Sequence, residues 1–462
     1  MRRVLAIAAA LACALLALAP AAGAQGRARF NTQLVAKVPP PGFPALAYVH
    51  PNTRVYVGSY VNPQGDNRRS RVFEYDGGTL LRSFVVPGQD LSREHGVQVA
   101  TSDSRGRLLL LDRNPARALK LNRSTGAFAQ YAGFADLPNC APLTSGPNCS
   151  PSKQDLPPVP NYAAWGPDGS LYVTDFQQAV IWRVPRGGGA AQVWLADERL
   201  DGGQFGTTGI ALAADRSALV IAQGSSGGPS VGGVNPTTGK LYLVQIQPGG
   251  GPGQLRQLWE SAPADLPDGF AIARSGNFYV PLAASNQLAV VAPDGRELER
   301  FPPVPQTGDN GSGVPFDTPS SVRFAGTRLI VANQSFGGNR DNQAILDVET
   351  REPGLEEFVY GLDRTKPSLS RVSVARVRVR FRLSERARVT GRVERRAGKG
   401  WSHVGSFTTR RLKAGRHSKS LSRVRLRGRV RKLRHGRYRL KLRARDVAGN
   451  RSRRVDRRFR VR

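Results

Sequence analysis

The segment Pro267-Asp268-Gly269-Phe270-Ala271-Ile272 is the clearest copy of a phrase that occurs six times in the chain. Each copy begins with a variable residue, often followed by Gly, and continues as a strand in which apolar residues alternate. The six variable residues are Ala45, His95, Asn161, Thr208, Asp268 and Ser320. Because a repeated phrase indicates a repeated supersecondary unit, we expect these six residues to form a ring around one central channel.

Each copy is followed by further strands. A second apolar strand comes next, as in Leu171-Tyr172-Val173 and Phe278-Tyr279-Val280, and turns such as Pro167-Asp168-Gly169 suit tight hairpins. The variable residues are 50, 66, 47, 60 and 52 residues apart. A four-stranded unit of this length, repeated six times, predicts an all-β fold, a six-bladed β-propeller over residues 25–361.

The composition changes abruptly near Asp363. Of the 68 Lys and Arg in the chain, 37 lie from Asp363 onward, together with only 5 of the 34 Asp and Glu. Apolar residues and arginines alternate strictly in Val377-Arg378-Val379-Arg380-Phe381-Arg382-Leu383. This pattern predicts half-buried strands with arginine on the solvent-exposed face. The ending Arg445-Asp446-Val447-Ala448-Gly449-Asn450-Arg451 resembles bacterial Ig-like surface domains. We therefore expect a basic Ig-like β-sandwich over residues 363–462.

The first 24 residues have the pattern of a secretory signal peptide. Arg2 and Arg3 precede an apolar run over residues 4–18, and Ala22-Gly23-Ala24 is a small-residue cleavage site. This run is too short to span a membrane, and no later segment is long and apolar enough. Cys13 within the run leaves a lipid anchor as an alternative. We expect a secreted or cell-envelope-associated protein without a transmembrane segment, cleaved near Ala24.

Two cysteines remain after such a cleavage, Cys140 and Cys149, in a loop rich in Pro, Ser and Asn. An exported chain with two nearby cysteines predicts a local disulfide. There is no Cys-x-x-Cys pair and no second Cys/His cluster, which argues against zinc binding or a redox function.

Residues 266–272, 276–280 and 293–295 together resemble a blade of the senescence-marker/gluconolactonase family. Pro160-Asn161-Tyr162 with residues 166–175 looks like the blade two places earlier. The resemblance covers about residues 40–360 and implies a six-bladed propeller. Propellers of the NHL type and of the strictosidine-synthase type are the alternatives.

The resemblance also implies a site. Enzymes of that family hold a divalent cation in the channel through a Glu, two Asn and an Asp, oxygen ligands that suit Ca²⁺. Asp268 stands where the family has its Asp, and Asn161 where it has one Asn. Thr208 stands at the position of the other Asn and Ala45 at that of the Glu, so one anionic ligand is missing. The implied site is an eroded one, with Asn161, Asp268 and Thr208 as the remaining metal ligands.

Two functions are compatible with such a ring. We prefer an exported, gluconolactonase-like propeller that binds a small molecule in its channel or associates with the envelope. The alternative is a Ca²⁺-dependent lactone or ester hydrolase, in which the metal polarises a carbonyl and Asp268 and His95 are the catalytic candidates. A structural interpretation also stands, in which Asp268 and Asn161 cap strands or turns and His95 is a structural histidine.

Other catalytic patterns are weak or absent. Gly224-Ser225-Ser226-Gly227-Gly228 matches the letters of a nucleophile elbow, but no helix is expected to follow it. We find no phosphate loop and no dinucleotide fingerprint, so no organic cofactor is expected.

The arginine-rich domain is expected to attract anionic cell-envelope polymers. The alternative is a solvated face without a partner. Specific nucleic-acid recognition is not expected, because the export signal argues against it and no aromatic residues are interleaved to stack on bases.

Overall fold

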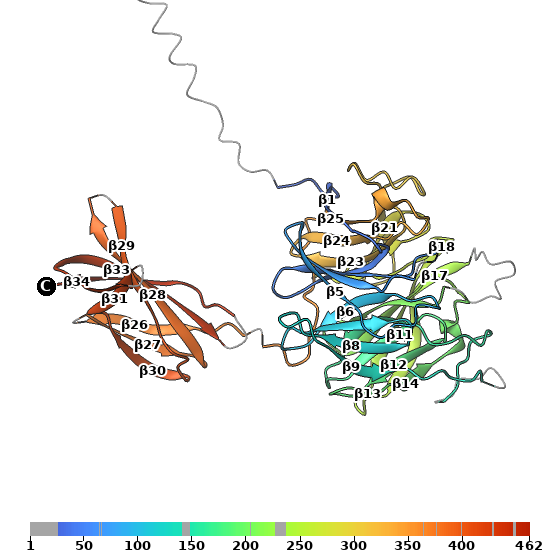
Figure 1. Ribbon diagram of the computed structural model, residues 1–462, viewed down its shortest axis with the longest axis horizontal. Helices are drawn as coiled ribbons and strands as arrows, with labels where there is room; N and C mark the ends of the chain where they lie inside the picture. Colours follow the sequence, from blue (N-terminus) through green and yellow to red (C-terminus); the bar gives the residue numbers. More distant parts are fainter. Residues whose placement is uncertain are drawn as a thin grey trace, which may run out of the picture. The chain divides into compact units, whose positions relative to one another are not determined.

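The computed structural model describes residues 26–63, 65, 67–140, 148–203, 205–226, 237–363, 365–375, 377–398, 400–426, 429–446 and 450–462. The predicted signal peptide, residues 1–24, lies outside them. The chain divides into two compact units, residues up to Tyr360 and Gly361–Arg462 (Figure 1). The described elements are strands, apart from the 3-10 helices η1 (Glu198–Leu200) and η2 (Arg340–Asn342). Within this described part, no helix is long and apolar enough to cross a membrane.

In its described residues, the first unit contains six sheets with four antiparallel strands each, and one of them carries a fifth, parallel strand. Each sheet is named here by its innermost strand. The first sheet contains β2 (Pro44–Val49), β3 (Val55–Ser59), β4 (Arg71–Asp76) and β5 (Thr79–Val85), and the second contains β6 (Val97–Ser102), β7 (Leu108–Asp112), β8 (Arg117–Leu121) and β9 (Phe128–Gly133), with β13 (Gly189–Ala190) added beside β9. The third contains β10 (Pro160–Trp165), β11 (Leu171–Asp175), β12 (Val180–Val184) and β14 (Gln192–Ala196), and the fourth contains β15 (Thr207–Leu212), β16 (Ala218–Gln223), β17 (Thr238–Ile246) and β18 (Pro252–Pro263). The fifth contains β19 (Ala271–Ile272), β20 (Phe278–Leu282), β21 (Gln287–Val291) and β22 (Glu297–Phe301), and the last contains β23 (Pro319–Ala325), β24 (Arg328–Asn333), β25 (Ala344–Glu349) and β1 (Thr32–Lys37).

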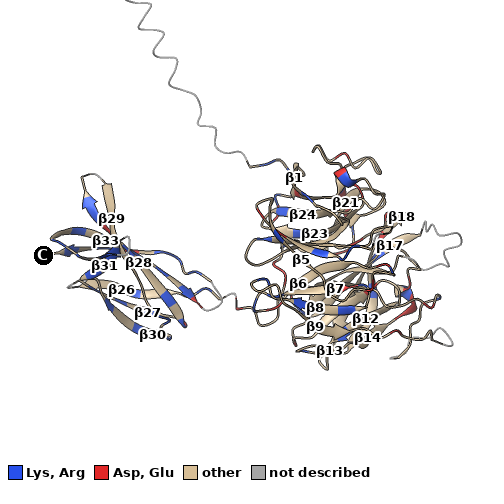
Figure 2. Ribbon diagram, viewed as in Figure 1, with Lys and Arg blue, Asp and Glu red and all other residues tan. Residues whose placement is uncertain are grey.

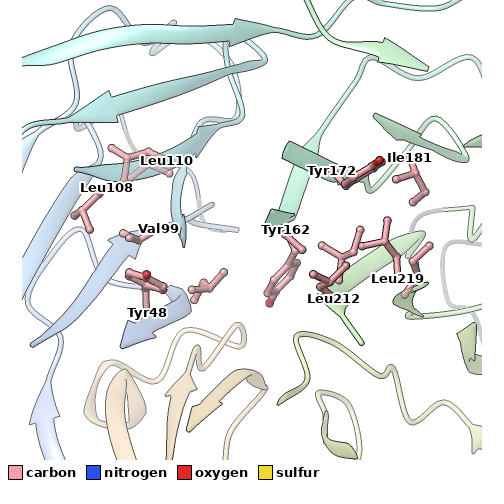
Figure 3. Close-up of a cluster of buried hydrophobic side chains, with 14 of the residues drawn as sticks. Tyr48, Val99, Leu108, Leu110, Tyr162, Tyr172, Ile181, Leu212 and Leu219 are labelled. Atoms are coloured by element: carbon pink, nitrogen blue, oxygen red, sulfur yellow. The ribbon is translucent and has the colours of Figure 1, made fainter. Parts of the chain in front are cut away.

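The second strands of these sheets are buried on both faces. Every residue of β7, β11 and β20 is buried, which explains why they are continuous apolar runs rather than alternating ones. Each sheet therefore packs against a neighbour on both sides. The resulting core includes the side chains of Tyr48, Leu110, Tyr172 and Leu219, with Tyr162 between its two halves in Figure 3.

Contacts between innermost strands run from sheet to sheet. The Gly269 amide donates to the Ser320 carbonyl at 2.9 Å, and the Ser320 hydroxyl donates to the Ala45 carbonyl at 2.8 Å. The circle of sheets is closed by β1, from the beginning of the unit. It pairs with β25, from the end of the unit, and becomes the fourth strand of the sheet of β23. Radially repeated four-stranded sheets, closed by the two ends of the unit, make a β-propeller.

The glycines of the repeated phrase allow the inner strands to approach one another. A Cβ added at Gly269 would lie 2.3 Å from the ring of Tyr162, and one added at Gly209 would lie 2.8 Å from the ring of Phe270. Both distances are shorter than a side chain tolerates, so the phrase needs Gly where another sheet supplies an aromatic ring.

The clearest copy of the phrase forms the shortest of the described inner strands. Only Ala271–Ile272 pair regularly with β20. Pro267 and Gly269 instead make isolated bridges to Leu282 and Ser321. The chain turns toward the neighbouring β23 at this point, which interrupts the regular ladder around Asp268.

The second unit consists of two sheets that share one core. The first has β26 (Leu369–Ala375), β27 (Arg378–Leu383) and β30 (Gly415–Ser420); the second has β32 (Arg429–Lys432), β31 (Arg423–Leu426), β29 (Gly400–Thr408), β28 (Ala387–Ala397), β33 (Gly436–Asp446) and β34 (Val455–Val461). Val379 and Phe381 of the first sheet and Val389 and Leu440 of the second lie in the same apolar cluster. Arginines at alternating positions face outward, and Figure 2 shows how few carboxylates accompany them.

The predicted disulfide between Cys140 and Cys149 is confirmed, with a Cα–Cα distance of 5.0 Å. The Cys140 amide also donates to the Ser150 carbonyl at 2.8 Å. The cross-link therefore fixes the base of a loop that joins the sheet of β6 to the sheet of β10.

Candidate functional site

The ring predicted from the sequence comes from the inner ends of all six sheets. Ala45, Asn161, Thr208 and Ser320 lie within β2, β10, β15 and β23, whereas His95 precedes β6 and Asp268 precedes β19. The side chains of Asn161, Thr208 and Ser320 make hydrogen bonds to neighbouring sheets. The ring is thus a structural seam as well as a candidate site.

Asn161 makes hydrogen bonds to two neighbouring sheets. Its Oδ1 accepts a hydrogen bond from Gln98 Nε2 at 2.7 Å, and its Nδ2 donates to the Thr207 carbonyl at 3.3 Å. The Thr208 hydroxyl donates to the Pro267 carbonyl at 3.1 Å. These bonds connect the sheets of β6, β10, β15 and β19, and they leave one lone pair on Asn161 Oδ1 and the lone pairs of the Thr208 hydroxyl for other donors or a cation.

Gln98 was not found from the sequence. It lies on β6, three residues after His95, and it is 2% exposed. Its Nε2 is bonded to Asn161, but its Oε1 is buried without a hydrogen-bond partner. An unpaired buried acceptor is uncommon and costly in a native protein. The only sequence feature that marks Gln98 is that it is a polar residue between the apolar Val97 and Val99.

Asp268 holds the second buried acceptor of this kind. Its Oδ1 has no hydrogen-bond partner. Burial raises the pKa of Asp268 to about 7, while the nearby Tyr162 phenol, Gly269 amide and Arg323 guanidinium lower it in part. The carboxyl therefore changes its charge near neutral pH, as an acid–base or cation-binding group does.

Tyr162 closes the middle of the propeller. Its side chain is 1% exposed. Tyr162 is a residue of β10. Its hydroxyl donates to the carbonyl of Ser320 at 2.9 Å, and Ser320 lies on β23, on the other side of the ring. The hydroxyl also lies 3.4 Å from the Ala45 carbonyl on β2. Because the phenol ring spans the centre, the ring positions are separated from the opposite ends of the inner strands.

At those opposite ends, residues 353–360 cross the propeller. The Leu355 amide donates to the Ile272 carbonyl at 2.8 Å, and Glu357 Oε1 accepts from the Thr101 hydroxyl at 2.5 Å. Tyr360 then packs on Gly169, where an added Cβ would lie 2.7 Å from its ring. The segment thus passes from the sheet of β19 over the sheet of β6 to the sheet of β10.

His95 does not face this site with a free nitrogen. Its Nδ1 lies 2.9 Å from the Arg93 carbonyl and its Nε2 lies 2.8 Å from the Arg68 carbonyl. Both ring nitrogens lie against backbone carbonyl oxygens, and a neutral ring donates to one of them; this geometry favours the structural interpretation of His95. The Gly224–Gly228 pattern is only partly described, since Gly227 and Gly228 lie outside the described residues.

A separate acidic cluster lies in the second unit. One carboxylate oxygen each of Asp363, Glu385 and Asp446 lies within 4.8 Å of the others. Asn450 Nδ2 donates to Asp446 Oδ2 at 2.9 Å and to the Asp363 carbonyl at 2.7 Å. Burial and the charges of Asp363 and Asp446 raise the pKa of Glu385. Three of the five carboxylates from Asp363 onward thus gather at one point.

No family model matches the chain, and no curated protein matches it either. Solved structures with a similar fold do exist. Calcium-binding regucalcin from Agrobacterium tumefaciens is 14% identical, with a TM-score of 0.43 over 70% of this chain and 98% of its own. A gluconolactonase from Xanthomonas campestris is 16% identical, with a TM-score of 0.39 over 69% and 100%.

Virginiamycin B lyase from Staphylococcus aureus is 15% identical, with a TM-score of 0.42 over 76% of this chain and 94% of its own. These three proteins have different activities or ligands. Similarity at this level therefore transfers no function to this chain, which has to be argued from its own residues.

Proposed function

We propose that this chain is an exported, gluconolactonase-like propeller of six blades, one for each sheet, and that its ring binds a small ligand. We propose further that the second unit is an Ig-like β-sandwich that attracts anionic envelope polymers. The closure of the last sheet by β1 supports the propeller. The disulfide supports export, because disulfides persist in oxidising compartments.

One observation carries the ligand-binding proposal. Asp268 Oδ1 in the ring and Gln98 Oε1 beside it are both buried acceptors without a hydrogen-bond partner, whereas Asn161 Oδ1 and the Thr208 hydroxyl each make a hydrogen bond. A ligand that supplies hydrogen-bond donors or positive charge would remove this penalty. The chemistry that fits is a polyhydroxylated compound or a cation, and the ring itself is the place where it would bind.

The oxygen atoms near Asp268 are of the type that binds a divalent cation. Asp268 would be its anionic ligand, and Gln98 Oε1, Asn161 Oδ1 and the Thr208 hydroxyl would be neutral oxygen ligands, as Ca²⁺ accepts. A cation bound there would polarise the carbonyl of a lactone or ester. This set of oxygen ligands is the specific observation in favour of the second candidate function, the hydrolase. With one carboxylate, such a site binds weakly compared with sites that offer several.

The test is thermal unfolding of the full chain with calcium chloride or with gluconolactone as probes. The variants are Asp268→Asn and the matched control Asp294→Asn, whose carboxylate accepts the Arg296 amide in an exposed turn. The quantity compared is the shift that each probe produces. A ligand at 100 times its Kd stabilises the folded state by about 2.7 kcal/mol, enough for a shift of several degrees.

Each outcome selects one alternative. A calcium shift that is lost in Asp268→Asn and kept in Asp294→Asn supports the cation site and the hydrolase. A shift with the lactone alone supports binding without metal. If neither probe shifts the parent chain, or if both variants respond equally, the ring is not the proposed site.

A further inference from the structure

The outer face of the sheet β26–β27–β30 carries a concentrated group of arginines. Arg371, Arg380, Arg382 and Arg416 are exposed there, and they line a hollow of about 510 Å³ together with Phe381, His417 and Ser418. Phe381 belongs to the core beneath. The hollow is therefore apolar at its floor and cationic at its rim. This group is called the arginine face below.

No carboxylate neutralises the arginine face in the described part of the unit. The ion pairs described there include those of Glu394 with Arg392, Arg439 and Lys441 and that of Asp456 with Arg454, on the other sheet or beside it. On the arginine face, Arg382 stands directly opposite Arg416. Like charges directly opposite each other destabilise a sheet, so an anion between them would remove a repulsion that the fold leaves in place.

The spacing of the arginines suits a linear polyanion. Alternate residues of a strand are about 6.8 Å apart, and neighbouring strands are about 4.8 Å apart. The guanidinium groups of Arg380 and Arg382 therefore repeat along the strand, and Arg416 adds a second row. Ser418, opposite Arg380, adds a hydroxyl donor. A guanidinium fork binds a phosphate or a carboxylate through two parallel hydrogen bonds.

The same face offers little for nucleobases. Phe381 is 2% exposed, so its ring is not available for stacking, which contributes to single-strand affinity in base-binding proteins. The other ring in the hollow, His417, lies 5.8 Å from the Phe381 ring, and its Nε2 lies 2.7 Å from the Lys413 carbonyl oxygen. The hollow can therefore recognise the charged backbone of a polymer but not bases.

We propose that the arginine face binds a flexible, base-free polymer that carries a phosphate in each repeat, with the Arg382–Arg416 pair at its centre. This deepens the proposal that the second unit attracts anionic envelope polymers, and it rests on that proposal. It adds a defined site to what would otherwise be diffuse attraction by positive charge.

The test measures binding of the full chain to short-chain inorganic polyphosphate at several salt concentrations. The double variant Arg382→Gln with Arg416→Gln removes the pair. The matched control, Arg437→Gln with Arg460→Gln, removes another directly opposed and exposed arginine pair, on β33 and β34. We expect the first double variant to lose affinity about tenfold or more. The slope of log affinity against log salt should fall by about 2, and the control should keep the slope of the parent.

Three results would overturn the proposal. An equal loss in both double variants means that the attraction is diffuse, which leaves the broader function intact. Tighter binding of oligothymidylate than of polyphosphate with the same number of phosphates means that bases contribute. Equal binding of polyglutamate at the same charge means that phosphate is not selected. If the parent chain binds none of these polymers, the broader function fails as well. Thermal unfolding of both double variants checks that they are folded.

Discussion

The two units of this chain contain similar numbers of cationic residues but use them in different ways. Before Asp363 the 31 Lys and Arg are nearly balanced by 29 Asp and Glu, and buried carboxylates bind arginines in pairs, as Glu74 binds Arg54 and Arg82. From Asp363 onward 37 cations accompany 5 acids. Glu394 is the main centre there, with three cationic partners. Paired charge fixes structure, whereas the surplus charge of the second unit faces solvent and is available for anions.

The largest effect on stability is expected at the centre of the propeller, which an uncharged side chain fills. Tyr162→Ala removes the phenol that fills the centre, and we expect a loss of about 3–5 kcal/mol in the free energy of unfolding. Tyr162→Phe keeps the ring and removes the hydroxyl, which donates to the Ser320 carbonyl and lies near Asp268, and should cost about 1 kcal/mol. Four of the five tryptophans lie in the propeller, so tryptophan fluorescence reports its unfolding. Equal effects of the two variants would mean that the phenol does not pack as described.

A smaller effect is expected at the charge centre of the second unit. Glu394→Gln leaves the cationic groups of Arg392, Arg439 and Lys441 without their carboxylate, and we expect a loss of about 2–4 kcal/mol. Calorimetry should place this change in the transition of the second unit.

The pH dependence of that loss follows from the same contacts. Although burial opposes it, the hydrogen bonds from Arg439 and Lys441 lower the pKa of Glu394 to about 2. The stabilisation is therefore complete above the unfolded value of 4.5 and disappears as the pH falls toward about 2. Parent and Glu394→Gln should differ at pH 7 and converge in strong acid. A difference that stays constant with pH would contradict this account.

The smallest effect should have the opposite sign. Glu385 lies beside Asp363 and Asp446, and burial and these charges raise its pKa above the usual 4.5. Its ionised form opposes folding at neutral pH. Glu385→Gln should therefore stabilise the second unit by a few tenths of a kcal/mol, and this gain should vanish below pH 4.5. Glu394→Gln is the matched control, because the same substitution is expected to destabilise there.

The sequence predicted the inner strands well because the phrase is local. Asn161, Thr208 and Ser320 lie within such strands, and the disulfide is confirmed. The partners that define the site are not local. Gln98 bonds to a residue 63 positions away, and Tyr162 bonds to one 158 positions away. A pattern within one repeat carries no information on which side chain of another repeat fills the centre.

The pattern of charged residues in the second unit likewise predicted only part of its structure. Alternation predicted arginines on one face of residues 377–383, and they lie there. It did not predict that Glu394 would be buried directly after the buried Val393. The alternation itself is regular there, because β28 pairs with β33 without a shift through Val393 and Glu394. Glu394 lies on the outer face opposite Arg439, and its cationic partners Arg392, Arg439 and Lys441 cover it. Strand alternation predicts the face on which a side chain lies, but not the partners from other strands that bury it.

The pairing of β1 with β25 has a consequence for when the propeller can fold. Arg27, just before β1, bonds to Asp347, which is 320 residues later in the chain. The first strand therefore waits without its partner until nearly the whole unit has been synthesised, and contacts of such long range make folding slow. A chain that stops before residue 344 would expose β24 as an open edge, a template for aggregation. Completion of the last sheet is thus a check that the entire propeller is present.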